Sequence, residues 1–335
     1  MSVTIRDVAS AAGTSIATVS KVINGSPSIS DATVERVKKA MDELSYTPNR
    51  RAQSFARQAT NNIAFITCLE RDAAFANPHM FEIMSGTQAA LARKGYTLSL
   101  LATDVNGIGV VKTIIAQKSV DGIVAHASVM TRDLAQMITK ENFPHIVIGV
   151  PGFNSHLCWI DNNNPYSGQM AANHLMDIGR RRIAYVGGRQ NDAISFARWQ
   201  GTHKAMQEGH IHFCEEYLKQ GDSTRQDGYR MMNELLTLKE RPDAVICANN
   251  HIALGCVKAL EHANVAIPRD VAVITFDDYP FSRITDPMLT VVNIDVYDLG
   301  FEAGNLVLEK IKKPNLQVQS YSTLPVLIVR GSTKA

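Results

Sequence analysis

The sequence predicts an α/β protein in which a small all-α headpiece precedes a core of two parallel-sheet, Rossmann-like lobes. Two patterns carry this prediction. Residues 1–46 contain three short amphipathic segments, and from residue 61 onward short apolar runs alternate with helical patterns. A chain of 335 residues with 45% hydrophobic and 20% charged residues is long enough for more than one globular domain.

Composition limits where the protein acts. No apolar run approaches the roughly 18 residues that a membrane-spanning helix needs, so we expect no contact with a membrane. The first residues are polar where a signal peptide would be apolar, which predicts a cytoplasmic protein. The five cysteines are odd in number and lack CxxC spacing, so we expect reduced core residues.

The N-terminal segment predicts three packed helices. The first covers residues 5–12 and ends at Gly13, which can adopt the positive φ common at helix C-termini. Ser15 is a suitable N-cap for a second helix over 16–23. A third helix covers 30–44, where apolar residues recur at helical spacing.

The second of these helices has the composition of a DNA-contacting helix. It begins with small and hydroxylated residues, so it can lie in the major groove with its backbone amides and hydroxyls near phosphates. Residues 1–60 hold eight Lys and Arg against five Asp and Glu, which is weak support by itself. A three-helix bundle that binds no nucleic acid remains an alternative at this point.

Two stretches make the N-terminal region specific: TIRDVASAAGTSIATVSKVING and SISDATVERVKKAMDELSYTPNRRAQSF. They resemble the headpiece and hinge of the lactose/galactose repressor (LacI/GalR) family. The resemblance implies a helix-turn-helix headpiece at 1–46 and, at 47–60, a hinge helix and linker that fold on the operator. It also implies a bacterial protein that is associated with the nucleoid when it is bound to its operator. The residues it assigns to DNA binding are Thr4, Ser15, Ile16, Ala17, Thr18, Ser20, Lys21, Asn24, Asn49, Arg50, Ala52, Gln53 and Phe55.

Two of these residues depart from the family pattern. Phe55 stands where paired hinge helices usually insert a Leu into the minor groove, and a flat ring can also enter an opened base step. Packing of Phe55 between hinge helices is the alternative. Lys21 stands where the family often has Arg or His. Because Lys cannot form a bidentate fork to guanine, the base it prefers stays open.

The core shows the pattern of repeated βαβ units. Its apolar runs are NIAFIT, YTLSLLA, DGIVAHA and HIVIGV, then RIAYVGG, AVICAN and VAVITFDD. Such runs predict parallel sheets that bind ligands at the carboxyl ends of their strands. The resemblance implies a periplasmic-binding-protein-like core for effector binding and dimerisation at 61–335. We expect an N-lobe at about 61–161 and 292–322 and a C-lobe at about 162–291 and 323–335.

Polar side chains follow several of the predicted strands. Carboxylates, amides and guanidinium groups suit a neutral polyol such as a sugar, because each hydroxyl both donates and accepts hydrogen bonds. The resemblance implies effector contacts for Arg198, Asn249 and Asp277. A capping or solvated loop role is an equal alternative for the others. The predicted effector-binding residues are His126, Asp161, Asn163, Arg198, Asn249 and Asp277.

This part of the sequence also departs from the family. The pair Asn249-Asn250 replaces Asn-Asp, Thr275 replaces a common Gly, and Asn163 stands where Asp is usual. Ser223 follows Gly-Asp where some members have an aromatic residue. Stacking against a ligand would then come from elsewhere, and the candidates are Phe75, Phe81 and Trp159.

These features predict a transcriptional repressor released from its operator by a small carbohydrate bound between the lobes. A repressor that needs a purine-like or other small corepressor is the alternative, and WIDNNN and ARWQG weakly resemble regulators of raffinose-type α-galactoside genes. No GxSxG, GxGxxG or Walker motif indicates an enzyme, a cofactor or a metal site. The expected partners are pseudopalindromic double-stranded operator DNA, an effector and a second copy of the chain, because the ending IVRGSTKA carries no heptad tail.

Overall fold

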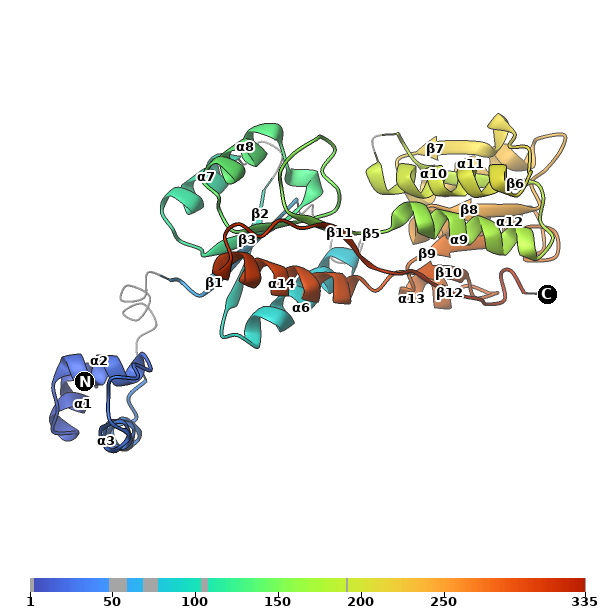
Figure 1. Cartoon of the computed structure of the whole chain (residues 1–335). Helices are drawn as coiled ribbons and strands as arrows, with labels where there is room; N and C mark the ends of the chain where they lie inside the picture. The colour runs from blue at the N-terminus through green and yellow to red at the C-terminus, as the bar shows by residue number, and fades with distance from the viewer. Residues whose placement is uncertain (1–2, 48–58, 69–77, 104–107, 191, 335) are drawn as a thin grey trace. The chain divides into compact units, whose positions relative to one another are not determined.

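The computed structural model describes residues 3–47, 59–68, 78–103, 108–190 and 192–334 (Figure 1). The chain divides into two compact units, one made of Met1–Asn62 with Val110–Asp121 and the other of Ile63–Gly109 with Gly122–Ala335. The predicted α/β class, with an all-α headpiece and two sheet-based lobes, is confirmed. In the described part of the chain no helix combines the length and apolarity needed to span a bilayer.

The headpiece consists of α1 (Ile5–Ala11), α2 (Ile16–Ile23) and α3 (Asp31–Glu43). Gly13 has a φ of 60° directly after α1. Ser15 caps α2 by accepting a hydrogen bond from the backbone N–H of Thr18 at 3.1 Å. The three helices meet at a small apolar core formed by Val8, Ala9, Ala12, Val19, Val37 and Ala40.

The first lobe is built on a six-stranded sheet in the order β11-β5-β4-β3-β1-β2. β11 pairs with β5, β5 with β4, β4 with β3 and β3 with β1 in parallel, and Ile63 lies opposite Gly122. Its elements are β1 (Asn62–Thr67), α6 (Pro78–Ala92), β2 (Thr97–Ala102), α7 (Ile108–Ala116), β3 (Gly122–His126), α8 (Arg132–Lys140), β4 (His145–Ile148), β5 (Trp159–Asn162), α14 (Val296–Lys312) and β11 (Gln319–Thr323).

Helices α6 and α14 cover one face of this sheet, and α8 covers the other (Figure 1). α6 and α14 approach closely because Gly86 and Gly300 lie where they cross. A Cβ at Gly86 would overlap the carbonyl oxygen of Tyr297, and one at Gly300 would overlap that of Ile83. This packing buries Ile83 completely.

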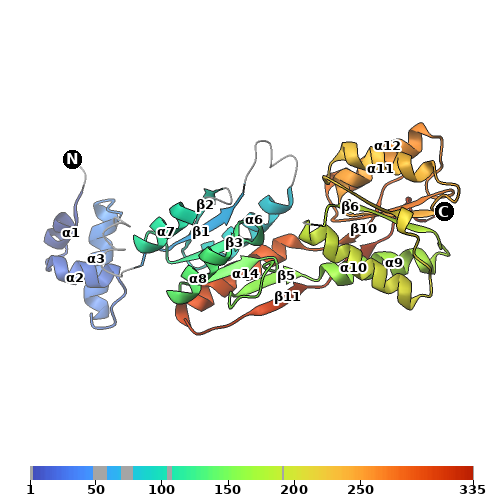
Figure 2. The same cartoon turned by 90° about the horizontal axis from the view of Figure 1, so that it is seen from above.

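The second lobe has the sheet order β12-β10-β9-β8-β6-β7. β12 runs antiparallel to β10, and the other pairs of neighbouring strands among the described residues are parallel. α9 and α10 cover one face and α11 and α12 the other (Figure 2). The elements are α9 (Asn164–Asp177), β6 (Ile183–Gly188), α10 (Ala193–Glu208), β7 (Leu218–Gly221), α11 (Arg225–Leu236), β8 (Ala244–Cys247), α12 (Asn250–His262), β9 (Ala272–Phe276), α13 (Pro280–Arg283), β10 (Thr290–Asn293) and β12 (Val326–Ile328).

The chain passes from the first sheet to the second after Asn162, returns after Asn293 and passes over again after Thr323. The return begins at residue 294, two residues later than the expected 292. The reason is that Thr290, Val291 and Val292 are buried and pair with Ile274, Thr275 and Phe276 of β9. Three crossings bring the carboxyl ends of strands from both sheets into one compact unit.

Candidate functional site

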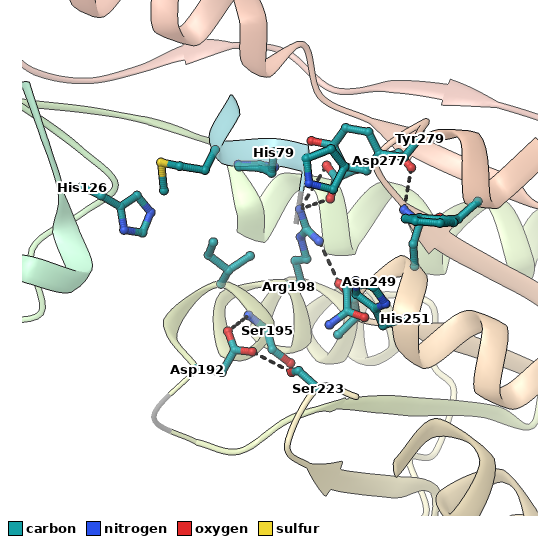
Figure 3. Close-up of a pocket in the computed structure, with 16 residues that line it drawn as sticks. His79, His126, Asp192, Ser195, Arg198, Ser223, Asn249, His251, Asp277 and Tyr279 are labelled. Atoms are coloured by element: carbon teal, nitrogen blue, oxygen red, sulfur yellow. Dashed lines mark hydrogen bonds and ion pairs between the residues drawn. The ribbon is translucent and has the colours of Figure 1, made fainter. Parts of the chain in front are cut away.

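Two adjoining cavities lie where strands of both sheets end. The first has a volume of about 330 Å³ and the second about 530 Å³. We call them the first and second compartments. Figure 3 shows the residues of the first, which come from α6, β3 and α10 and from the segments that follow β6, β7, β8 and β9. The residues that line both compartments, here called the waist, are His79, His126, Asp192, Ile194 and Arg198.

Arg198 on α10 is the most firmly held charged side chain of the waist, with 3% of its surface exposed. Its Nε donates to Asn164 Oδ1 at 3.1 Å, and its Nη1 donates to the carbonyl of Ala248 at 2.8 Å. Its Nη2 lies 3.3 Å from Asp277 Oδ2. These contacts engage three of the five guanidinium N–H groups, so the rest can face a ligand.

Asp277 follows β9 and is 7% exposed. Its φ of 66° lies in the left-handed region, which non-glycine residues adopt at some energetic expense and which recurs at functional sites. The neighbouring Asn250 stabilises this turn by donating to the carbonyls of Phe276 and Asp277 at 2.8 and 2.9 Å. An Asp at position 250 would have no N–H to offer these two carbonyls. These two hydrogen bonds explain locally why Asn250 stands where the family pattern Asn-Asp has an Asp.

Asn249 is the N-cap of α12, and its Oδ1 accepts from the N–H of Ile252 at 2.9 Å. Since the oxygen is used for the cap, the amide nitrogen is the group left to donate into the first compartment. The capping role and the lining role belong to the same side chain.

Asp192 is a waist residue that the sequence analysis missed. It caps α10, because its Oδ1 accepts from Ser195 N at 3.0 Å. Its Oδ2 accepts from the hydroxyl of Ser223 at 2.9 Å. Ser223, which replaces an aromatic residue, thus holds a carboxylate at the cavity wall. The available signal was an Asp placed between a strand and a helix, four residues after Gly188.

Two neutral histidines complete the waist. Burial, with a smaller contribution from nearby His79, lowers the pKa of His126 to about 4. Burial also lowers the pKa of His79, although Asp277 opposes the shift. Neither ring therefore carries a charge at neutral pH. His126 ends β3 as expected for a candidate from the first lobe, whereas His79 was not predicted.

Of the two candidates Asp161 and Asn163, only Asp161 lines the second compartment. Asp161 lines it from β5, and burial raises the pKa of this carboxyl to about 6 although backbone N–H groups hydrogen-bond to it. Asn163 caps α9 by accepting from Tyr166 N at 3.0 Å and lines neither compartment. Its neighbours Asn162 and Asn164 line the second compartment instead.

The aromatic residues of the site differ from the expected ones. Neither Phe81 nor Trp159 lines a compartment, and Phe75 lies outside the described residues. Tyr279 and Phe281, which follow the turn at Asp277, line the first compartment. The available signal was their place two and four residues after Asp277, which is itself a predicted site residue.

The headpiece presents the expected residues on α2. Ile16 is 44% exposed although it is apolar, and Ala17 and Lys21 are exposed as well, whereas Val19 faces the core. Thr18 and Ser20 are half-buried. The hydroxyl of Thr4 donates to Asp7, and Asn24 donates to Ser20. The remaining expected contacts lie outside the described residues: Asn49, Arg50, Ala52, Gln53 and Phe55.

A family model described as "Bacterial regulatory proteins, lacI family" matches residues 4–49, and one described as "Periplasmic binding protein-like domain" matches 172–333. The HTH-type transcriptional repressor PurR of Haemophilus influenzae (strain PittEE) is 33% identical over 338 residues, which is 99% of each chain. PurR of Actinobacillus pleuropneumoniae serotype 3 (strain JL03) is 31% identical over 99% of this chain and 98% of its own.

Solved structures of transcriptional regulators are also similar to this chain. The transcriptional regulator CelR in complex with cellobiose is 31% identical, with a TM-score of 0.74 over 98% of this chain and 99% of its own. The lac repressor dimer bound to operator and the anti-inducer ONPF has a TM-score of 0.83 at 24% identity, with both chains fully covered.

A helix-turn-helix headpiece joined to a two-lobed ligand-binding core defines a DNA-binding transcriptional regulator that responds to a small molecule. The chain belongs to the LacI family of bacterial regulators, as its identity to the PurR repressors over almost its whole length shows.

Proposed function

We propose that the protein is a repressor whose operator binding is weakened by a neutral carbohydrate held in the two compartments. The observation that carries this proposal is the charge balance of the walls. Arg198 is paired with Asp277, and both waist histidines are neutral. Asp192 adds a negative charge to the wall of the same compartment. Such walls disfavour an anionic ligand and offer a neutral polyol both donors and acceptors.

Apolar groups support the same ligand class. Ile194 and Met80 lie beside the polar groups of the first compartment, together with the ring of Phe281. A sugar ring presents C–H faces between its hydroxyls, so a mixed wall of this kind suits it. The binding of cellobiose by CelR, at 31% identity, supports a carbohydrate for this chain as well.

A corepressor-dependent repressor that binds a purine-like metabolite is the second candidate. The identity of 33% to repressors named PurR favours it. A flat base would need stacking partners, and Tyr279 and Phe281 are the aromatic rings available on the second-lobe side of the first compartment. The two candidates predict opposite effects of the effector on operator affinity.

The proposed mechanism is linkage between two sites. In a homodimer, two α2 helices would lie about one DNA turn, roughly 34 Å, apart and contact a pseudopalindrome. An effector that binds the operator-free arrangement more tightly shifts the population toward it. A coupling of about 1–3 kcal/mol would change operator affinity about 5- to 150-fold.

The test begins with operator selection. Purified protein is mixed with fragmented genomic DNA of its source organism at a fixed salt concentration, because phosphate contacts make affinity salt-dependent. The enriched duplex is then titrated with protein in the presence of mono- and disaccharides or of purine bases. Release by a sugar supports the proposal. Tighter binding with a purine base, and no effect of any sugar, supports the second candidate and contradicts the first.

A matched pair of variants ties the response to the cavity. Arg198→Lys removes the planar fork that contacts Asn164, Ala248 and Asp277, so the response to effector should be lost. Arg269→Lys makes the same substitution in an exposed ion pair with Asp270 and should leave the response unchanged. Equal responses in the two variants would place the effector elsewhere.

A further inference from the structure

Three hydrogen bonds hold the end of the segment that joins the headpiece to the first lobe. We call this segment, residues 44–61 between α3 and β1, the connector. Thr60 N and Thr60 Oγ1 donate to Asp121 Oδ1 at 2.7 and 2.9 Å. Asn61 N donates to Asp121 Oδ2 at 2.8 Å. Both carboxylate oxygens of one side chain therefore hold the last two residues of the connector.

Asp121 is itself held by the pairing of β1 with β3. It directly precedes β3, and its backbone N–H donates to the carbonyl of Asn62 at 2.9 Å. One residue further along each strand, Ile63 lies opposite Gly122. The hydroxyl of Thr60 also accepts from the N–H of Asn62 at 3.3 Å. Strand pairing thus fixes the carboxylate, and the carboxylate fixes the connector.

The backbone of the connector turns where it meets this carboxylate. Asn61 has a φ of 49°, in the left-handed region that Asn adopts more readily than most residues. With this turn the N–H groups of residues 60 and 61 both face Asp121. Hydrogen bonds to an ionised acceptor are roughly twice as strong as neutral ones. The direction in which the chain leaves β1 is therefore defined at residues 60 and 61.

A defined exit from the first lobe favours binding to a specific DNA site. A regulator that docks on its operator loses freedom in the segments between headpiece and core, and this loss opposes binding. A joint that is already ordered has less freedom to lose, so the same DNA contacts give a higher affinity. Binding to random DNA depends mainly on phosphate charge and needs no fixed register, so it gains less from an ordered joint.

We propose that Asp121 is a positioning residue for operator binding. It fixes the end of the connector and thereby raises the affinity for the operator, and it acts through Thr60 and Asn61. The inference requires only a DNA-binding regulator of the LacI family, so it holds for either candidate effector.

Asp121→Asn tests this role with little change in shape. The amide can keep its oxygen toward Thr60, but it then presents an N–H group to the N–H of Asn61, so at least one hydrogen bond is lost. We expect operator affinity to fall about tenfold, which corresponds to about 1.4 kcal/mol. Removal of a negative charge would by itself strengthen binding to DNA. The expected loss therefore has the opposite sign to a purely electrostatic effect.

Asp133→Asn is the matched control. It removes the same charge from an exposed position in the first turn of α8, in the first lobe. We expect its operator affinity to equal or slightly exceed that of the parent. Each variant is titrated with the selected operator and with a random duplex of equal length, at one salt concentration and under the conditions in which the parent binds its operator. Affinity for the random duplex should stay within about twofold of the parent in both variants.

Two substitutions at Thr60 test the same contact from the connector. Thr60→Val removes the hydroxyl but keeps the branched shape and the backbone N–H, whereas Thr60→Ser keeps the hydroxyl. We expect Thr60→Val to bind the operator about threefold more weakly than the parent and Thr60→Ser to bind like the parent. In an Asp121→Ala background, which has no carboxylate for the hydroxyl to contact, Thr60→Val should have no further effect.

Thermal unfolding of the full-length variants separates positioning from a general effect on stability. A merely structural role of Asp121 would lower the melting temperature and weaken binding to the operator and the random duplex alike, and that result overturns the proposal. Operator affinity of Asp121→Asn equal to or above that of the parent also overturns it. If Asp121→Asn does not fold, the Thr60 variants decide. A loss in Thr60→Val alone supports the proposal, and equal affinities of the Val and Ser variants overturn it.

Discussion

At the scale of single residues, some side chains of the site both cap a helix and line a cavity. Asn249 and Asp192 cap helices with one oxygen, and each also lines a cavity. Asn250 secures the left-handed turn at Asp277 through two carbonyls. Caps and turns are local interactions, so they place these side chains accurately before any ligand arrives.

Asp161 provides a prediction about pH. Its pKa is raised from 3.8 to about 6 mainly by burial, so the folded protein binds this proton more tightly than the unfolded chain does. The stabilising effect of the proton is complete below pH 3.8 and is lost as the pH rises through 6. Asp161→Asn should therefore gain stability relative to the parent between pH 4 and pH 7, by at most about 3 kcal/mol.

Urea denaturation at pH 4, 5, 6 and 7 measures this difference. The Asn side chain keeps an oxygen for Asn162 N–H, so the substitution changes charge with little change in shape. Asp270→Asn is the control of opposite sign, because hydrogen bonds to Arg269 and Ala266 lower the pKa of Asp270 to about 2. A parent and an Asp161→Asn variant with parallel pH profiles would contradict the assignment.

At the scale of elements, the second lobe depends on helix pairs that touch through glycine. A Cβ at Gly168 on α9 would overlap the carbonyl oxygen of Arg198 on α10, and one at Gly201 would overlap that of Pro165. The position of the Arg198 side chain thus follows from the contact between two helices. The same arrangement recurs where α11 meets α12 at Gly228 and Gly255.

Gly168→Ala should force α9 and α10 apart, since the obstacle is backbone that cannot rotate away. We expect a loss of about 1–3 kcal/mol in the free energy of unfolding, together with weaker effector binding because Arg198 moves. Thermal unfolding and calorimetric titration measure the two effects. Gly109→Ala in α7 is the matched control, because a Cβ there meets nothing within 4 Å, and it should not destabilise the protein.

Substitutions on the buried and exposed faces of α2 can distinguish effects on headpiece stability from effects on DNA binding. Val19→Ala removes buried volume from the headpiece core and should lower its stability by about 1–3 kcal/mol. Ile16→Ala changes an exposed side chain and should leave unfolding nearly unchanged while it weakens binding to the selected operator. If Ile16→Ala binds that operator like the parent, Ile16 makes no base contact.

At the scale of the whole molecule, the proposed control of DNA binding requires reciprocity. If the effector weakens operator binding by some factor between about 5 and 150, the operator must weaken effector binding by the same factor. Titrating the effector into the protein with and without saturating operator duplex measures this second factor. Unequal factors would mean that the protein does not cycle between the same states in the two experiments.

Much of the fold could be predicted because its signals are local. The Gly13 turn, the Ser15 cap and the short apolar strands each lie within a few residues of the structure they specify. Local signals alone do not distinguish the role of Asn163, which we expected to bind the effector. Asn163 stands at a predicted strand end, but its side chain caps the helix that follows, and nothing in the spacing distinguishes these roles.

The sequence by itself determined the family, the α/β class, the headpiece and the candidates Arg198, Asn249 and Asp277 near strand ends, because periodicity and short motifs encode them. Only the tertiary structure brought His79, Asp192, Tyr279 and Phe281 to the same cavity and left Asn163 outside it. The physical reason is that a parallel sheet gathers the ends of strands far apart in the chain, and three crossings place two such sheets in one unit. No local pattern records which of those ends will meet.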